Sequence, residues 1–147
     1  MTSAFRVLGA LGAAALASVA CYAPVEVRQA SRALSVSQAG GDAVQVEALD
    51  FAFGLSATTH RAGRIDFVVR NAGEVSHELV VVPFERGEYG TFLGEVDDVD
   101  PGQSKALRID LPPGKYRLVC LQLSHLPDAP PESHLYLGME TGFEVTS

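Results

Sequence analysis

The sequence predicts an all-β fold, a Greek-key β-sandwich over residues 44–147, from three observations. Short segments in which apolar and polar residues alternate recur along this part of the chain, as strands with one buried face require. Glycine and proline, of which the chain has 14 and 8, separate these segments and mark turns. No stretch after residue 43 has the apolar period of an amphipathic helix. Many short strands with such punctuation are typical of an antiparallel sandwich or Greek-key barrel.

The first three expected strands lie in the first half of this region. Residues 44–53 have a mostly alternating pattern, which favours a strand. After a connection over 58–63, residues 65–70 are rich in Ile, Phe and Val and end at an Asn-Ala-Gly turn signal. A run of valines follows in residues 77–82, and Pro83 closes that strand.

The remaining expected strands lie beyond an irregular stretch. Residues 84–99 are acidic toward their end and show no clear period, so we expect a loop there, with a short helical turn as the alternative. After a Pro-Gly turn signal, residues 104–111 alternate as a strand, and a Pro-Pro-Gly turn separates them from a strand over 116–121. The last strand is expected over residues 142–146.

Composition and charge narrow the class of protein. The 147 residues have room for one domain with one core. The formal net charge is -7 and no block of Lys or Arg occurs, so nucleic acid and anionic membrane surfaces are excluded as expected partners. An acidic carrier that meets a protein with a basic docking surface fits this balance better.

Residues 1–20 have the layout of an export signal. A basic residue precedes an alanine-rich apolar run over 7–16, and small residues follow up to Cys21. The run is shorter than the ~20 apolar residues that a membrane-spanning helix needs. We therefore expect an exported protein, periplasmic or extracellular. Cys21 is an alternative acceptor for a lipid anchor, which would be the expected membrane attachment, and residues 21–43 are expected to form a flexible tether.

Cys120 is the one cysteine left after the export signal, apart from Cys21. A structural disulfide is therefore not expected, although the compartment is oxidising. An unpaired thiol in an exported protein is exposed to oxidation, and ligation of a metal gives it a reason to be kept. The alternative is that Cys120 is a small buried apolar residue within a strand.

The last third of the chain places a thiol, an imidazole and a thioether in one segment. Cys120, His134 and Met139 lie between two expected strands, and His77 opens another strand directly after a turn. Two His, one Cys and a weak axial Met are the ligands of a mononuclear copper site for electron transfer. We therefore expect one copper ion at one end of the sandwich, where these strands would meet.

The same residues resemble the cupredoxins, the blue copper proteins of the plastocyanin and azurin type. The resemblance extends from about Val44 to Val145 and implies a Greek-key β-sandwich with a type 1 copper centre. The motifs that carry it are Asn-Ala-Gly-Glu-Val-Ser-His over 71–77, Pro-Gly at 101–102, Leu-Pro-Pro-Gly-Lys-Tyr-Arg-Leu-Val-Cys over 111–120 and His-Leu-Tyr-Leu-Gly-Met over 134–139.

One departure from the short-loop cupredoxins leaves the second histidine ligand open. The segment between Cys120 and Met139 is longer and holds two histidines. His125 has the family's spacing from the cysteine, and His134 has its spacing to the methionine. We favour His134, because the Gly-Met pair and the last strand fix its neighbourhood, and keep His125 as the alternative ligand.

Other types of site are not supported by the residues present. A structural zinc site would need more cysteines or a closer His pair, and no Gly-rich phosphate loop or Gly-x-Ser-x-Gly elbow occurs. We therefore expect a Cu(II)/Cu(I) electron carrier and not an enzyme. The alternatives are a periplasmic module for copper delivery or storage and a metal-free interaction domain. Near His134 we expect an apolar contact patch for a redox partner, formed by Leu123, Leu126, Tyr136 and Leu137.

Overall fold

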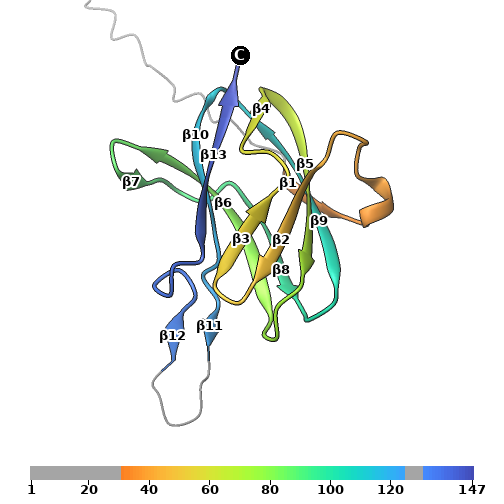
Figure 1. Ribbon diagram of the computed structural model, residues 1–147. Helices are drawn as coiled ribbons and strands as arrows, with labels where there is room; N and C mark the ends of the chain where they lie inside the picture. Colours follow the sequence, from red (N-terminus) through yellow and green to blue (C-terminus); the bar gives the residue numbers. More distant parts are fainter. Residues whose placement is uncertain (1–30, 125–130) are drawn as a thin grey trace, which may run out of the picture.

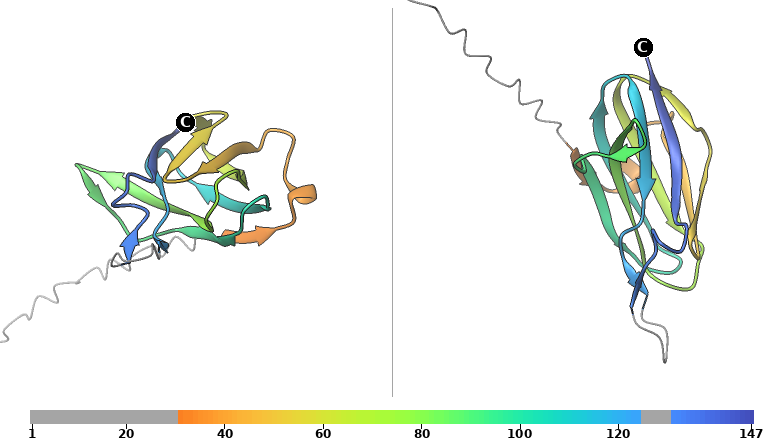
Figure 2. Two further views of the ribbon diagram at one scale, coloured as in Figure 1. Left: turned by 60° about the horizontal axis from the view of Figure 1, so that its bottom comes forward. Right: turned by 90° about the vertical axis from the view of Figure 1, so that its left-hand side faces the viewer.

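Two β-sheets pack face to face in the computed structural model, which describes residues 31–124 and 131–147 (Figures 1 and 2). One sheet has the order β1 (Ser31–Leu34), β9 (Ser104–Leu111), β5 (Gly63–Asn71), β2 (Val44–Leu49) and β3 (Ala52–Leu55). The other has the order β4 (Thr59–Arg61), β13 (Glu140–Thr146), β10 (Gly114–Val119), β6 (His77–Glu85) and β7 (Glu88–Tyr89), and β8 (Gly94–Val99) also pairs with β6. The predicted all-β sandwich is confirmed.

Alternation along the strands accounts for the position of the core. In β2 the side chains of Val44, Val46 and Ala48 are buried and those between them are exposed, so one face of the strand turns inward. The inner faces of both sheets supply the largest buried side chains, among them Phe67, Ile65, Leu79, Leu107 and Leu118. Phe67 and Phe143 meet edge to face across the core with ring centroids 5.1 Å apart, a favoured aromatic geometry.

A small ribbon extends from one end of the sandwich, away from the C-terminus (Figure 1). It consists of β11 (Leu123–Ser124) and β12 (Glu132–Ser133), which pair antiparallel. The ribbon follows β10 and precedes β13, so the segment predicted to hold most of the metal ligands lies at this end. Within the two described ranges, no helix is long and apolar enough to span a membrane.

Several strands lie where the sequence did not predict them. The predicted tether over residues 21–43 contains β1, which pairs with β9, and a short 3-10 turn over Val36–Gln38. The predicted loop over residues 84–99 contains β7 and β8. Residues 59–61, predicted as part of a connection, form β4 beside β13. Residues 1–30, with the predicted export signal and Cys21, lie outside the described residues.

A partly buried ion pair holds the segment after β1 against the sheet. The Arg108 guanidinium donates two hydrogen bonds of 2.7 Å to Asp66, which is 8% exposed, and one of 2.9 Å to the carbonyl of Gln38. The amide of Gly40 donates to the same Asp66 carboxylate at 2.7 Å. These bonds attach residues 38–40 to β5 and β9, which explains why the predicted tether is not free here.

We expect Asp66→Asn to destabilise the protein at neutral pH by about 1–3 kcal/mol, because charged hydrogen bonds to a buried group are lost. The hydrogen bonds from Arg108, against the opposing effect of burial, lower the pKa of Asp66 from its usual 3.8. A group with a lowered folded-state pKa stabilises the fold above its unfolded pKa, and this contribution is lost as the pH falls through the folded pKa. The difference between wild type and variant in urea unfolding should therefore be largest at pH 7 and shrink at pH 2–3, about the range below the unfolded pKa. Asp110→Asn, at an exposed position of β9, is the control, and an equal effect at this position would contradict the account.

Candidate metal centre

His77 begins β6 at the ribbon end of the sandwich, and a side-chain network fixes the turn before it. The Asn71 side chain donates 2.7 Å hydrogen bonds to the carbonyls of Val75 and Val99 and accepts one of 2.8 Å from the amide of Gly73. Asn71 is fully buried, so its amide replaces the strand hydrogen bonds that end here. The Asn-x-Gly turn therefore delivers the His77 side chain, which is 0% exposed, to a fixed position.

The outer nitrogen of His77 is held by a carboxylate from another part of the chain. Nε2 of His77 lies 3.3 Å from Oδ1 of Asp50, in the turn between β2 and β3. Asp50 is itself held by the amide of Glu74, at 3.0 Å to the same oxygen. Although burial opposes the shift, the hydrogen bonds from Glu74 and His77 lower the pKa of Asp50. The carboxylate therefore fixes the ring orientation and leaves Nδ1 of His77 to face the interior.

Cys120 directly follows β10 and is fully buried. The pairing of β6 with β8 shifts register between His77 and Leu79, and such an irregularity frees a backbone group from the ladder. The Glu78 amide donates to Sγ of Cys120 at 3.4 Å, and the Glu78 side chain accepts a 2.7 Å bond from the amide of Leu121. Glu78 in β6 thus binds the sulfur of Cys120 through its backbone amide and the amide of Leu121, the next residue, through its carboxylate.

His134 and Met139 lie in the turn that leads from β12 to β13. The amide of Met139 donates to the carbonyl of His134 at 2.9 Å, and the amide of Cys120 donates to the carbonyl of Met139 at 3.1 Å. Gly138 has a φ of 99°, a conformation that favours glycine at this turn. His134 is 1% exposed and Met139 is 0% exposed, so both predicted ligands are inside the protein. The two backbone hydrogen bonds connect His134 to Met139 and Met139 to Cys120.

Three of the predicted ligands converge on one buried point. Nδ1 of His134 lies 3.2 Å from Nδ1 of His77 and 3.3 Å from Sγ of Cys120, and the three donor atoms lie within 4.8 Å of one another. The rings of Phe51 and His134 meet edge to face at 4.9 Å. His77, far away in the sequence, thus lies beside the ligands near the C-terminus. His125 lies outside the described residues.

Burial favours the neutral form of all three donors. It raises the pKa of the Cys120 thiol to about 11. It also lowers the pKa of His77, against the effect of Asp50, and the pKa of His134, with a further contribution from His77. A neutral imidazole is ready to bind a metal, and a bound cation would favour the thiolate over the thiol.

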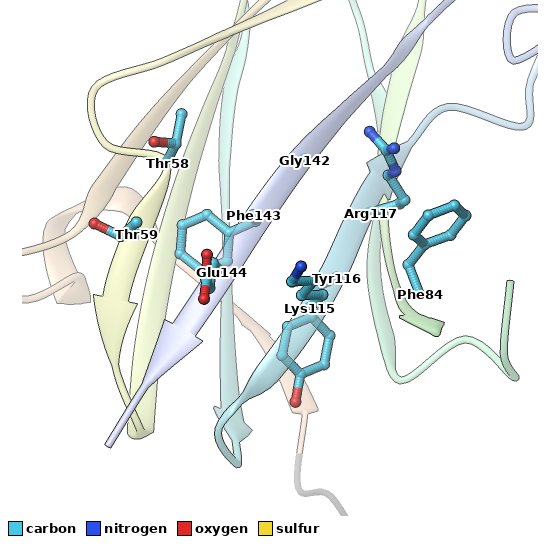
Figure 3. A pocket seen from close by; sticks show the side chains of 9 residues that line it. All are labelled: Thr58, Thr59, Phe84, Lys115, Tyr116, Arg117, Gly142, Phe143 and Glu144. Carbon is cyan, nitrogen blue, oxygen red and sulfur yellow. The ribbon is translucent and has the colours of Figure 1, made fainter. Parts of the chain in front are cut away.

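A separate surface pocket lies outside this centre. It is formed by β4, β6, β10 and β13 and contains none of the predicted ligands (Figure 3). Gly142 in β13 is paired with Arg117 in β10, and the Arg117 guanidinium lies 4.5 Å from the centre of the Phe84 ring. Arg117, one of the charged residues that line this pocket, lies against an aromatic face. None of the predicted ligands lies there, so the metal centre remains the candidate functional site.

Solved structures share this architecture. Reduced auracyanin from Roseiflexus castenholzii matches with a TM-score of 0.53 and 14% identity, over 70% of this chain and 95% of that chain. Auracyanin B matches with a TM-score of 0.53 and 19% identity, over 71% and 88%. A single-residue variant of rusticyanin matches with a TM-score of 0.50 and 12% identity, over 80% and 98%. The chain has the cupredoxin fold.

The cupredoxin fold is identified from structure, since no protein-family model and no curated protein matches the sequence. Two supporting residues of the centre, Asp50 and Glu78, are absent from the sequence prediction. Asp50 precedes Phe51, which has a φ of 67°, and only the fold shows that this turn reaches His77. Glu78 follows a predicted ligand directly, and that adjacency is the signal by which it could have been found.

Proposed function

We propose that the protein is an electron carrier in which His77, Cys120 and His134 would hold one copper ion and Met139 would be a weaker fourth ligand. The observation that carries the proposal is the convergence of two imidazole nitrogens and one thiol sulfur at a buried point. All four residues are at most 1% exposed. The proposed carrier role does not require a substrate pocket at the metal.

The spacing of the donors fits a single ion. Two nitrogens bound at about 2.0 Å to one metal at trigonal angles lie about 3.5 Å apart. The separation of 3.2 Å between Nδ1 of His134 and Nδ1 of His77 is close to that value. With a metal–sulfur bond of about 2.3 Å, a nitrogen and a sulfur would lie about 3.7 Å apart, and Sγ of Cys120 lies 3.3 Å from Nδ1 of His134. Small shifts of side chains that are already in place would therefore be enough to bind the metal.

The donor set selects copper over other common metals. Cysteine sulfur is a soft ligand that favours Cu(I), and imidazole accepts both Cu(I) and Cu(II). When bound, copper would supply a one-electron couple between these two states. Zinc sites with a single cysteine and two histidines are usually completed by a further strong ligand or by water, whereas the residue supplied here is a buried methionine.

The hydrogen bonds around the donors favour electron transfer over copper delivery. Asp50 holds one imidazole, Glu78 holds the thiol and the following amide, and the backbone joins Met139 to Cys120. A centre fixed from several strands changes little between oxidation states. A delivery module, the alternative from the sequence, needs ligands that open and release the metal.

The proposal is tested by adding Cu(II) to the reduced, metal-free protein. We expect one copper per chain, an intense visible absorption from the thiolate, a reversible reduction potential and fast self-exchange of electrons. Binding with slow self-exchange would instead favour delivery or storage. Absence of the thiolate absorption would contradict the proposal.

Asp50→Ala is expected to weaken copper binding about 10-fold to 100-fold, because loss of a hydrogen-bond partner of a metal-bound imidazole has effects of this size. The affinity is measured by competition with a chelator of known strength. Asp42→Ala removes an exposed carboxylate outside the centre and serves as the control. Equal affinity of the Asp50 variant and the wild type would show that Asp50 does not position His77.

We also propose that the carrier works outside the cytoplasm and exchanges electrons with a protein that has a basic docking surface. The export signal expected over residues 1–20 and the net charge of -7 support this. Attraction between opposite charges accelerates association and weakens as salt rises. Whether Cys21 carries a lipid is tested by mass spectrometry of the mature protein.

A further inference from the structure

Because His134 is buried, electrons are expected to reach the centre through another part of the surface. The ring is 1% exposed, so a partner has almost no surface of this ligand to touch. Tyr136 and Leu123, members of the predicted contact patch, are 83% and 54% exposed, and Leu126 lies outside the described residues. Exposure of these neighbours alone does not bring a partner to the ring.

An apolar groove lies beside the centre on the outer face of the sheet that contains β6 and β10. Its volume is about 370 Å³, and its lining is almost entirely apolar. Phe92 and Leu121 contribute much of its surface and are 56% and 45% exposed. The residues that matter here are Val82, Tyr89, Phe92, Val119, Leu121 and Leu135. An exposed apolar patch of this kind marks a contact surface.

Covalent bonds connect the groove to two of the proposed ligands. Val119 and Leu121 are the neighbours of Cys120 in the chain, and Leu135 follows His134. Consecutive Cα atoms are about 3.8 Å apart. A protein that contacts Val119 or Leu121 in the groove therefore touches a residue that is bonded directly to Cys120. Compared with the exposed residues Tyr136 and Leu123, the groove therefore has the shorter covalent path to the sulfur of Cys120.

Acidic side chains border the groove. Glu140 is paired with Val119 across β13 and β10, and it accepts a 2.7 Å hydrogen bond from the hydroxyl of Tyr89. Glu95 is paired with Val80, which packs with Val82 and Val119, and Glu88 is exposed at the hairpin of β7. Two cations lie nearby. Arg86 is exposed in the hairpin before Glu88, and Arg117 lies 3.9 Å from Glu140 and against Phe84. An apolar floor with an acidic border is complementary to a basic protein surface.

We infer that this groove is the docking surface for a redox protein that presents an apolar contact surrounded by Lys and Arg. The inference rests on the proposed electron-carrier function and adds the place at which the partner binds. A second copy of this chain fits less well, because two molecules with a net charge of -7 repel one another.

The first experiment locates the contact without relying on electron transfer. The copper-loaded protein in its Cu(I) state is titrated with a basic c-type cytochrome at low salt, and amide shifts are followed by NMR. We expect the largest changes at Val82, Val119, Leu121 and Leu135. Changes centred on Tyr136 and Leu123, or no changes, would overturn the inference. If copper does not bind, the same titration of the metal-free protein tests whether the cytochrome contacts the groove.

The second experiment measures the rate. Phe92→Lys places a cation in the groove, away from the metal ligands, and should lower the second-order rate constant with the cytochrome about tenfold or more, the effect expected of a central contact residue. Val36→Lys makes the same change of charge at a residue that is 40% exposed after β1, and it should change the rate less than about twofold. Both variants should keep the absorption and potential of the wild type.

The outcomes separate the groove from the function. Equal rates for the two lysine variants, with normal copper absorption, would overturn the groove and leave the carrier function standing. A self-association that Phe92→Lys abolishes, together with an unchanged rate toward the cytochrome, would assign the groove to a second copy of the chain and overturn the inference. The inference is supported if Phe92→Lys lowers the rate constant, Val36→Lys does not, and the difference between the two variants disappears at high salt.

Discussion

Cys120→Ser is expected to abolish the thiolate absorption of the copper-loaded protein completely. The absorption requires a bond between copper and sulfur, and Sγ of Cys120 is the sulfur that lies 3.3 Å from Nδ1 of His134. A hydroxyl is a harder and less basic donor than a thiolate, so copper affinity should also fall. The visible spectrum and a copper titration measure the two effects.

Cys21→Ser is the matched control for this substitution, because the chain has 2 cysteines. It should keep the absorption and the copper stoichiometry of the wild type. The Cys120 variant is expected to fold, since serine has nearly the same volume as cysteine. Circular dichroism and urea unfolding test this. An absorption that survives in the folded Cys120 variant would mean that the copper is held elsewhere.

His134→Ala is the second substitution with a large expected effect, and it should also abolish the visible band. Nδ1 of His134 is the donor that lies close to both other donors, so its removal leaves one imidazole and one thiol. Added imidazole should partly restore the band, because it fits the space that the missing ring leaves. Loss of a ligand, and not of the fold, would explain such a rescue.

His125→Ala is the comparison that resolves the two histidines of the long segment. We expect its spectrum and copper affinity to equal those of the wild type within about a factor of two, since the proposed ligand set does not include His125. A band that is lost in the His125 variant and retained in the His134 variant would exchange their roles and contradict the proposed ligand set.

Most of the fold could be predicted because alternation and turn residues are local signals. The pattern of Val44, Val46 and Ala48 predicts β2, and the turns at 71–73 and 112–114 predict where β5 and β9 end. Strand β8 was missed because its exposed face carries Glu95, Asp97 and Asp98, and acidic residues resemble a loop. Strand β1 was missed because its place depends on β9, which lies about half the chain away.

The candidate site divides in the same way. The order of His77, Cys120, His134 and Met139 is a property of the sequence, and the structure brings the first three together. The support from Asp50 and the burial of His134 depend on packing between distant segments. A sequence pattern reports which donors are present, whereas a close approach across the sandwich follows from the pairing of its strands.

X-ray absorption at the copper edge of the loaded protein tests the central claim most directly. We expect one sulfur and two imidazole nitrogens bound to each copper in both oxidation states, with nearly the same distances in the two. A copper surrounded by nitrogen and oxygen alone, without a bound sulfur, would contradict the account.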